Sequence, residues 1–276
     1  MKVRRPTHGI VNPALGFEHF RLARYEPSAD LAPFAERYWI VRWDLRDREP
    51  YDSQILPHPS VHLSFSADRA EVHGVGTRLF VRRLVGAGHV FGVKFTPAGF
   101  RPFIEASVAT LTDRVLSPDE AFGVSCGELT RSVANEDDDL ATRALVEAFL
   151  RRRGPTASAE TALANRLVEA ARVDRELARA EDLAIVGGLG LRAMQRMFRE
   201  HVGVGPKWVI RRFRIHDAAE RCRDGATLDW AALAQELGYF DQAHFSRDFK
   251  AQLGRSPTDY ARACREAATT RGDADT

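Results

Sequence analysis

Two short segments in the C-terminal third of the chain carry side chains suited to the edges of DNA bases. Arginine can donate two hydrogen bonds to guanine O6 and N7, and glutamine can pair in a similar way with adenine N6 and N7. The candidate base-contacting residues are Arg192, Gln195, Arg196, Gln242, Ala243, His244, Ser246 and Arg247. An isolated arginine on a helix is usually a solvated charge, so the case for DNA contact depends on the elements that hold these residues.

Both segments lie in a motif that occurs twice. The first copy begins at Leu183 and reads LAIVGGLGLRAMQRMFREHVGVGP, and the second begins at Leu233 and reads LAQELGYFDQAHFSRDFKAQLGRSP. Each copy opens with Leu-Ala, turns at a glycine, continues as a predicted helix and closes in Gly-x-x-Pro. Gly187 and Gly238 are the predicted turn residues, since a sharp corner between two helices often requires a positive φ. The repeat predicts two helix-turn-helix units.

The second helix of each predicted unit has a clear apolar face. Met194 and Phe198 lie four positions apart in the first copy, as Phe245 and Phe249 do in the second. Residues at this spacing share one side of a helix, so both pairs are expected to pack inward against the preceding helix. The candidate base-contacting residues then point outward.

A single long helix is expected between the two copies. Pro206 suits the first position of a helix, and Gly225 suits a C-terminal stop. At about 1.5 Å of rise per residue this helix would span roughly 28 Å. One turn of B-DNA repeats at roughly 34 Å, so two units on such a helix could meet successive turns of one DNA face.

These residues resemble the DNA-binding domain of the AraC/XylS family, across roughly Glu160 to Arg265. The resemblance is carried by GVGP at Gly203, GRSP at Gly254 and the run GYFDQAHFSRDFK from Gly238. One departure is Gly190, where the family more often has serine. The resemblance implies two recognition helices facing successive major-groove segments, one through Arg192, Gln195 and Arg196 and the other through Gln242, Ala243, His244 and Arg247.

The N-terminal half has the pattern of β-strands. The predicted strands are Tyr38 to Trp43, Val61 to Ser66 and Val90 to Phe95, and the spacing turns helical after Pro97. The predicted fold class is therefore α+β, with a mainly antiparallel N-terminal domain, in which a cupin-like barrel is one open arrangement, and an all-α C-terminal domain. The predicted boundaries are 1–150 for the first domain, 151–159 for a linker, 160–266 for the DNA-binding domain and 267–276 for a disordered tail.

The N-terminal segment is also similar to an uncharacterised domain often fused to such regulators, through LPHPSVHLSF, VFGVKFTPAGF and LTDRV. That resemblance names no ligand, and we expect a sensor or dimerisation module. The alternative is a catalytic or metal-binding barrel fused to the DNA reader. His58, His62, His73 and His89 lack the ligand spacing of a metal site, and Cys126 has no identified base. We therefore expect neither enzyme activity, nor a metal, nor a cofactor.

Composition narrows the choice of partner. The net charge of the chain is only +2, but residues 190–265 hold 14 lysines and arginines against 9 aspartates and glutamates, a net charge of +5. A local basic excess favours a polyanionic partner. Three distant cysteines argue against a disulfide framework and a thiolate zinc site. The sequence shows neither a signal peptide nor a membrane span, so we expect a cytoplasmic protein.

The expected partner is double-stranded DNA. RNA polymerase, a small-molecule or protein effector and a second copy of the chain stay open as further partners, and no membrane is expected.

Overall fold

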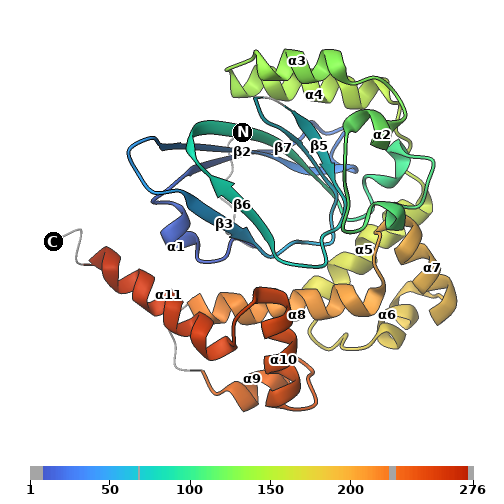
Figure 1. Cartoon of the computed structure of the whole chain (residues 1–276). Helices are drawn as coiled ribbons and strands as arrows, with labels where there is room; N and C mark the ends of the chain where they lie inside the picture. Colours follow the sequence, from blue (N-terminus) through green and yellow to red (C-terminus); the bar gives the residue numbers. More distant parts are fainter. Residues whose placement is uncertain (1–8, 68, 224–227, 273–276) are drawn as a thin grey trace.

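The computed structural model describes residues 9–67, 69–223 and 228–272 (Figure 1). Its N-terminal part contains two antiparallel sheets. The six-stranded sheet has the order β1 (Arg21–Tyr25), β2 (Ala35–Leu45), β7 (Gly86–Phe95), β4 (His62–Phe65), β5 (Ala70–His73) and β8 (Val115–Leu116). The smaller sheet pairs β3 (Tyr51–Ile55) with β6 (Phe80–Leu84). No strand pairing within the described residues joins these two sheets, so the arrangement is two open sheets and not a closed barrel.

The three predicted strands lie in β2, β4 and β7, and the alternation in β4 is confirmed on one side. Val61, Leu63 and Phe65 are buried in the main core, as the period of two predicts. The side chains of His62 and Ser64 point to the opposite face, where they line a cavity between the two sheets. The sequence did not predict what lies against this second face, because the periodicity of a strand separates its two faces and does not specify what covers them.

Helices cover the face of the large sheet that carries the main core. They are α2 (Pro118–Phe122), α3 (Gly127–Ala134) and α4 (Asp139–Arg152), preceded by the 3₁₀ turns η1 (Arg101–Phe103) and η2 (Val108–Leu111), while the short α1 (Pro13–Gly16) lies near the smaller sheet (Figure 1). The rings of Phe95, Phe100, Phe122 and Phe149 join strand, turn and helices in a series of edge-to-face contacts, a favourable geometry for aromatic pairs.

The C-terminal part is entirely helical within the described residues. Its helices are α5 (Ala159–Val173), α6 (Ala180–Gly187), α7 (Leu191–His201), α8 (Pro206–Arg223), α9 (Trp230–Glu236), α10 (Gln242–Leu253) and α11 (Pro257–Gly272). Figure 1 shows α6 and α7 beside one end of α8 and α9 and α10 beside the other. The predicted α+β fold class is confirmed. The predicted helix stop at Gly225 lies outside the described residues.

Two local expectations from the sequence need correction. The left-handed turn residue of the first unit is Gly188, with φ of 61°, and not Gly187, which is the last residue of α6. Gly238 has the predicted positive φ, at 74°. The segment from residue 267 is also not wholly a tail, because α11 continues to Gly272. That helix is anchored by the buried Tyr260, and the alanines that follow favour its continuation. Residues 273–276 lie outside the described part.

The chain between the two domains is short. Helix α4 runs through Arg152, and α5 begins at Ala159 after Ser158, whose side chain accepts a hydrogen bond from Thr161 N. The non-helical connection is therefore shorter than the 151–159 segment expected as a linker. None of the described helices combines the length and the apolar character that a membrane span requires.

Candidate nucleic-acid interface

Helix α7 in the first unit is strongly two-sided. Met194 and Phe198 are fully buried against Leu183 and neighbouring apolar residues of α6 and α8. Three candidate residues, Arg192, Gln195 and Arg196, are exposed on the other side of the same helix. As in other amphipathic helices, the spacing of the apolar residues determines which face of α7 is exposed to solvent.

Helix α10 repeats this arrangement in the second unit. Phe245 and Phe249 are fully buried beside α9, α11 and the end of α8. The structure exposes Gln242, Ala243 and Arg247 and leaves His244 and Ser246 half-buried. The ring of His244 meets that of Tyr239 edge-on at 5.2 Å, so its orientation is partly fixed by the turn.

The orientation of α10 against α8 is held by a polar contact that the sequence analysis missed. Tyr239 Oη donates to Asp248 Oδ2 at 2.6 Å, and Arg211 of α8 forms an ion pair with Asp248 Oδ1 at 2.8 Å. Burial, followed by the bond to Asp248, raises the pKa of Tyr239 well above its usual range. The phenol therefore stays protonated at neutral pH, and its hydrogen bond fixes the turn to helix α10.

The beginnings of the two helices differ. Asp241 Oδ1 accepts a hydrogen bond of 2.6 Å from His244 N, which satisfies one of the free donors at the start of α10. Gly190 occupies the same position in α7 and supplies no side-chain cap. The amides at the beginning of α7 are consequently left to water or to an external acceptor.

Part of the basic excess lies inside the protein. Arg212 and Arg214 of α8 are only 1% and 2% exposed. Arg214 Nη2 donates to the carbonyl oxygens of Asp174, Arg175 and Leu177, and thereby fixes the α5–α6 loop. Burial lowers the pKa of Arg212 to about 10. These two arginines serve the fold, so the charge available to a polyanion is smaller than the sequence count of +5 for residues 190–265.

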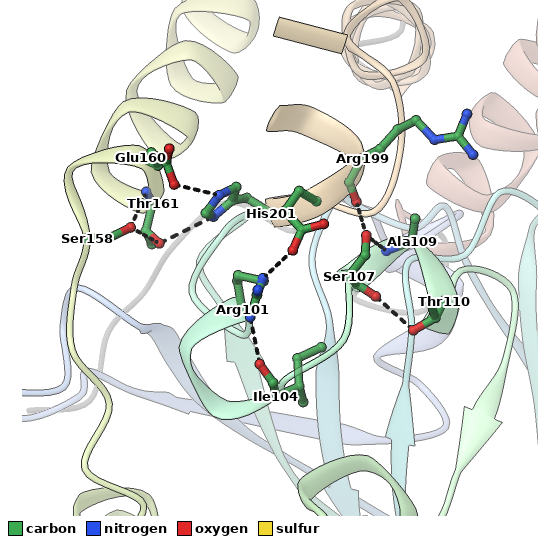
Figure 2. A network of polar contacts seen from close by, with 11 residues as sticks. Arg101, Ile104, Ser107, Ala109, Thr110, Ser158, Glu160, Thr161, Arg199 and His201 are labelled. Carbon is green, nitrogen blue, oxygen red and sulfur yellow. Dashed lines mark hydrogen bonds and ion pairs between the residues drawn. The ribbon is translucent and has the colours of Figure 1, made fainter. Parts of the chain in front are cut away.

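The N-terminal domain contacts the C-terminal end of α7 (Figure 2). Arg101 Nε donates to Glu200 Oε1 at 2.8 Å, and Ser107 Oγ donates to the carbonyl oxygen of Arg199 at 3.0 Å. Figure 2 also shows His201 near Glu160 and Thr161, the latter with its Oγ1 3.4 Å from His201 Nδ1. Helix α7 is therefore held at its C-terminal end by the domain that precedes it.

One candidate residue lies close to that contact. Gln195 is exposed but lines a hollow of about 770 Å³ together with Ala109 and Thr112 of the N-terminal domain. Thr112 Oγ1 donates to the carbonyl oxygen of Gly203 at 2.7 Å on the floor of this region. A ligand approaching Gln195 would thus pass beside the N-terminal domain, whereas Arg192 does not line this hollow.

Three histidines of the N-terminal half, His58, His62 and His73, line the cavity between the two sheets, whereas Cys126 is buried in the main core. His58 stacks on His216 of α8, and Ser64 Oγ lies 3.0 Å from His73 Nε2. Burial raises the pKa of the Cys126 thiol to about 11. Within the described ranges, no three His, Cys, Asp or Glu side chains lie together as a metal site would require.

Comparison with known protein families assigns two segments. Residues 183–263 match a family described as "Helix-turn-helix domain", and residues 23–117 match a "Domain of unknown function (DUF6597)". A "Putative AraC-like transcription regulator" of Streptomyces lividans is 38% identical over 80 residues, and one of Streptomyces antibioticus is 33% identical over 79 residues. Each match covers 29% of this chain and only 26% of the relative's length.

Similar solved structures include two of ToxT from Vibrio cholerae. The protein of strain O395 bound to (E)-4-(8-methylnaphthalen-1-yl)but-3-enoic acid is 11% identical with a TM-score of 0.41, and the match covers 89% of this chain and 99% of that one. The protein of strain SCE256 bound to an unsaturated fatty acid is 10% identical with a TM-score of 0.38, covering 81% and 94%.

Proposed function

We propose, from the match of residues 183–263 to a helix-turn-helix family and their similarity to AraC-like regulators, that the protein is a transcription regulator that reads two adjacent major-groove segments of double-stranded DNA. The observation that carries the proposal is the matched pair of helices α7 and α10. Each buries two apolar side chains and exposes arginine and glutamine on its other side.

The exposed groups suit the chemistry of base recognition. Arg192, Gln195 and Arg196 on α7 offer guanidinium and amide groups to one groove segment, and Gln242 and Arg247 on α10 do so for the next. Ala243, His244 and Ser246 complete the proposed contact set on α10. The two helices pack on opposite ends of α8, which has 18 residues and so a length of about 27 Å. This separation is compatible with successive turns of one DNA face.

We also propose that the N-terminal domain senses an effector or joins two copies of the chain, since it contacts both α7 and α8 through defined hydrogen bonds. Its position beside the recognition helix allows a change in that domain to reach the DNA reader. A catalytic or metal-binding barrel, the alternative expected from sequence, has no supporting observation among the described residues and is not proposed.

The test is selection of DNA by the full-length purified protein from a random library, followed by sequencing. We expect an enriched site with two conserved blocks whose centres lie about 10 base pairs apart. Binding to that site should weaken steeply with salt, because neutralised phosphates release counterions. Failure to enrich any sequence at low salt, by a protein that is folded by circular dichroism, would contradict the proposal.

A further inference from the structure

The two sheets of the N-terminal domain enclose a cavity of about 210 Å³. Its most distinctive wall is aromatic. Trp39 and Trp43 of β2 lie opposite Gly92 and Gly88 of β7 in the strand register, and a Cβ atom on either glycine would collide with the facing indole. The glycines therefore make room for two flat rings on the cavity wall, a surface suited to a planar apolar molecule.

The charged side chains on the cavity wall all have the same sign. Arg24, Arg37, Arg82 and Lys94 line the cavity, and no carboxylate does so among the described residues. Glu36 pairs with Lys94 at 2.7 Å and with Arg37 at 2.6 Å without lining the cavity itself. A low-dielectric space lined by cations favours an anion, because the electrostatic field is screened less there than in water.

The wall also holds a donor that has no acceptor. The indole nitrogen of Trp39 is buried and makes no hydrogen bond. A buried N–H without a partner is destabilising, and such groups are uncommon in folded proteins. Beside it on the same wall, His62 is kept neutral, since burial holds its pKa well below the usual range. A neutral imidazole can donate one hydrogen bond and accept another, so the cavity offers several donors to an acceptor group.

We propose that this cavity binds an aromatic monocarboxylate, with its ring system against Trp39 and Trp43 and its carboxylate toward Arg82 and Lys94. The apolar wall accommodates the rings, and the excess of cations and donors selects the negative group. Binding of the ligand does not require DNA. A regulatory effect of the ligand on DNA binding rests on the proposed function.

The cavity is joined to the DNA-binding domain by the loop that closes it. Pro57 and His58 line the cavity, and the carbonyl oxygen of Pro57 lies 3.3 Å from both Arg212 Nη1 and His216 Nε2 of α8. The rings of His58 and His216 stack at 4.2 Å. Arg212 Nη2 donates to the carbonyl oxygen of Thr77 at 2.7 Å, beside the cavity. A ligand that shifts this loop therefore acts on the helix that carries both reading units.

The first experiment measures affinity of the full-length protein by calorimetry for two probes, 2-naphthoate and its neutral amide, 2-naphthamide. They share one ring system and differ in charge. We expect the carboxylate to bind at least tenfold more tightly. Equal affinity would overturn the preference for an anion, and absence of naphthoate binding at millimolar concentration would overturn the proposed ligand class.

Strand β6 supplies a matched pair of variants. Arg82 lines the cavity, and Arg83, its neighbour, is exposed on the opposite face of the strand. Arg82→Gln is expected to weaken naphthoate at least fivefold and to leave naphthamide unchanged, while Arg83→Gln leaves both unchanged. Melting curves check that both variants fold. An equal effect of the two substitutions would mean that only the overall charge matters, which would contradict binding in the cavity.

The second experiment tests the connection to α8 by hydrogen exchange. Saturating naphthoate is expected to slow exchange in residues 56–58 and in α8, and His216→Ala should abolish the change in α8 while naphthoate affinity stays within twofold. A change confined to the sheets would overturn the coupling and leave the site intact. A protein that binds naphthoate but enriches no DNA sequence would contradict the proposed function and not the cavity.

Discussion

Arginine has two different roles in the C-terminal domain, and only the structure separates them. Arg196 and Arg247 extend from equivalent positions of two exposed helix faces, whereas Arg212 and Arg214 are buried and donate to backbone carbonyls. All four count equally in the net charge of the sequence. The two pairs should therefore respond differently to substitution.

Replacing Arg196 or Arg247 with alanine should cost about 1–3 kcal/mol of DNA-binding free energy and relax the preference at one base position if the arginine contacts a base. A phosphate contact would instead weaken all sequences alike and lower the salt slope by about one. Fluorescence anisotropy on the selected site and its single-base variants distinguishes the two. Arg83→Ala, on the exposed face of β6, is the control. If both recognition-helix variants keep wild-type affinity and preference, the two-helix reading is wrong.

Arg214→Ala should lower the free energy of unfolding by about 2–4 kcal/mol, because three carbonyl oxygens lose their donor inside the protein. Urea unfolding followed by circular dichroism measures the loss. Arg262→Ala is the comparison, since Arg262 is exposed and forms ion pairs with Asp259 and Glu266 of its own helix; its effect should stay below about 1 kcal/mol. Equal effects at the two positions would contradict the structural role of Arg214.

Acid should weaken the N-terminal domain through its buried histidines. Burial lowers the pKa of His62 and His73 below the usual value of 6.5. These histidines therefore take up protons at a higher pH in the unfolded chain than in the folded one. The free energy of unfolding is thus greatest above pH 6.5, where both imidazoles are neutral, and declines as the pH falls below that value. Urea midpoints at pH 7.5 and pH 5.5 measure the decline. His62→Gln should reduce it, and an unchanged pH dependence in that variant would exclude His62 as a source.

At the scale of elements, the two helix-turn-helix units differ mainly at the start of their second helix, α7 in the first unit and α10 in the second. Helix α10 has Asp241 as its cap, and α7 begins after Gly190 without one. The backbone at Gly190 has φ of −69°, which any residue can adopt, and an added Cβ there meets nothing within 4 Å. Gly188, two residues earlier, has φ of 61° and belongs to the turn.

Gly190→Ser should therefore stabilise the first unit by about 0.5–1 kcal/mol, through a new cap and a less flexible unfolded chain. Gly188→Ala should destabilise it by about 1 kcal/mol, because alanine resists the left-handed conformation. The free energy of unfolding in urea checks both variants. The opposite order of stability would show that α7 does not begin where the structure places it.

At the scale of the whole molecule, the domains are fastened to each other through α8. Arg212 donates to two carbonyl oxygens of the N-terminal domain and stacks over Trp208, with its guanidinium carbon 4.5 Å from the ring centre. Arg211, the preceding residue, pairs instead with Asp248 of the second unit. Of these neighbouring arginines on α8, Arg212 therefore joins the two domains, and Arg211 makes a contact within the C-terminal domain.

The full-length protein should accordingly unfold in one transition, and Arg212→Met should separate the domains into two. Tryptophan fluorescence and far-ultraviolet circular dichroism, recorded against urea, should coincide for the natural protein and diverge for this variant. Arg211→Met should lower the midpoint without separating the signals. Coincident transitions in Arg212→Met would show that the other contacts of the interface suffice to hold the domains together.

Local patterns in the sequence were sufficient to predict the elements of the C-terminal domain. The spacing of Met194 with Phe198 and of Phe245 with Phe249 identified the buried faces of α7 and α10, because helical periodicity is a property of a few consecutive residues. The antiparallel strands of the first domain followed from alternation for the same reason. One of the two predicted turn residues was wrong: the positive φ lies at Gly188, one position after the predicted Gly187.

Only the tertiary structure decided what lies against the other faces. His62 and Ser64 alternate correctly with the core residues of β4, yet it is the distant pairing of β3 with β6 that places them in a cavity. Arg212 and Arg214 are buried because loops far away in the chain present carbonyl oxygens to α8. Periodicity specifies that a face exists, whereas its environment depends on contacts between residues far apart in sequence, which no local pattern contains.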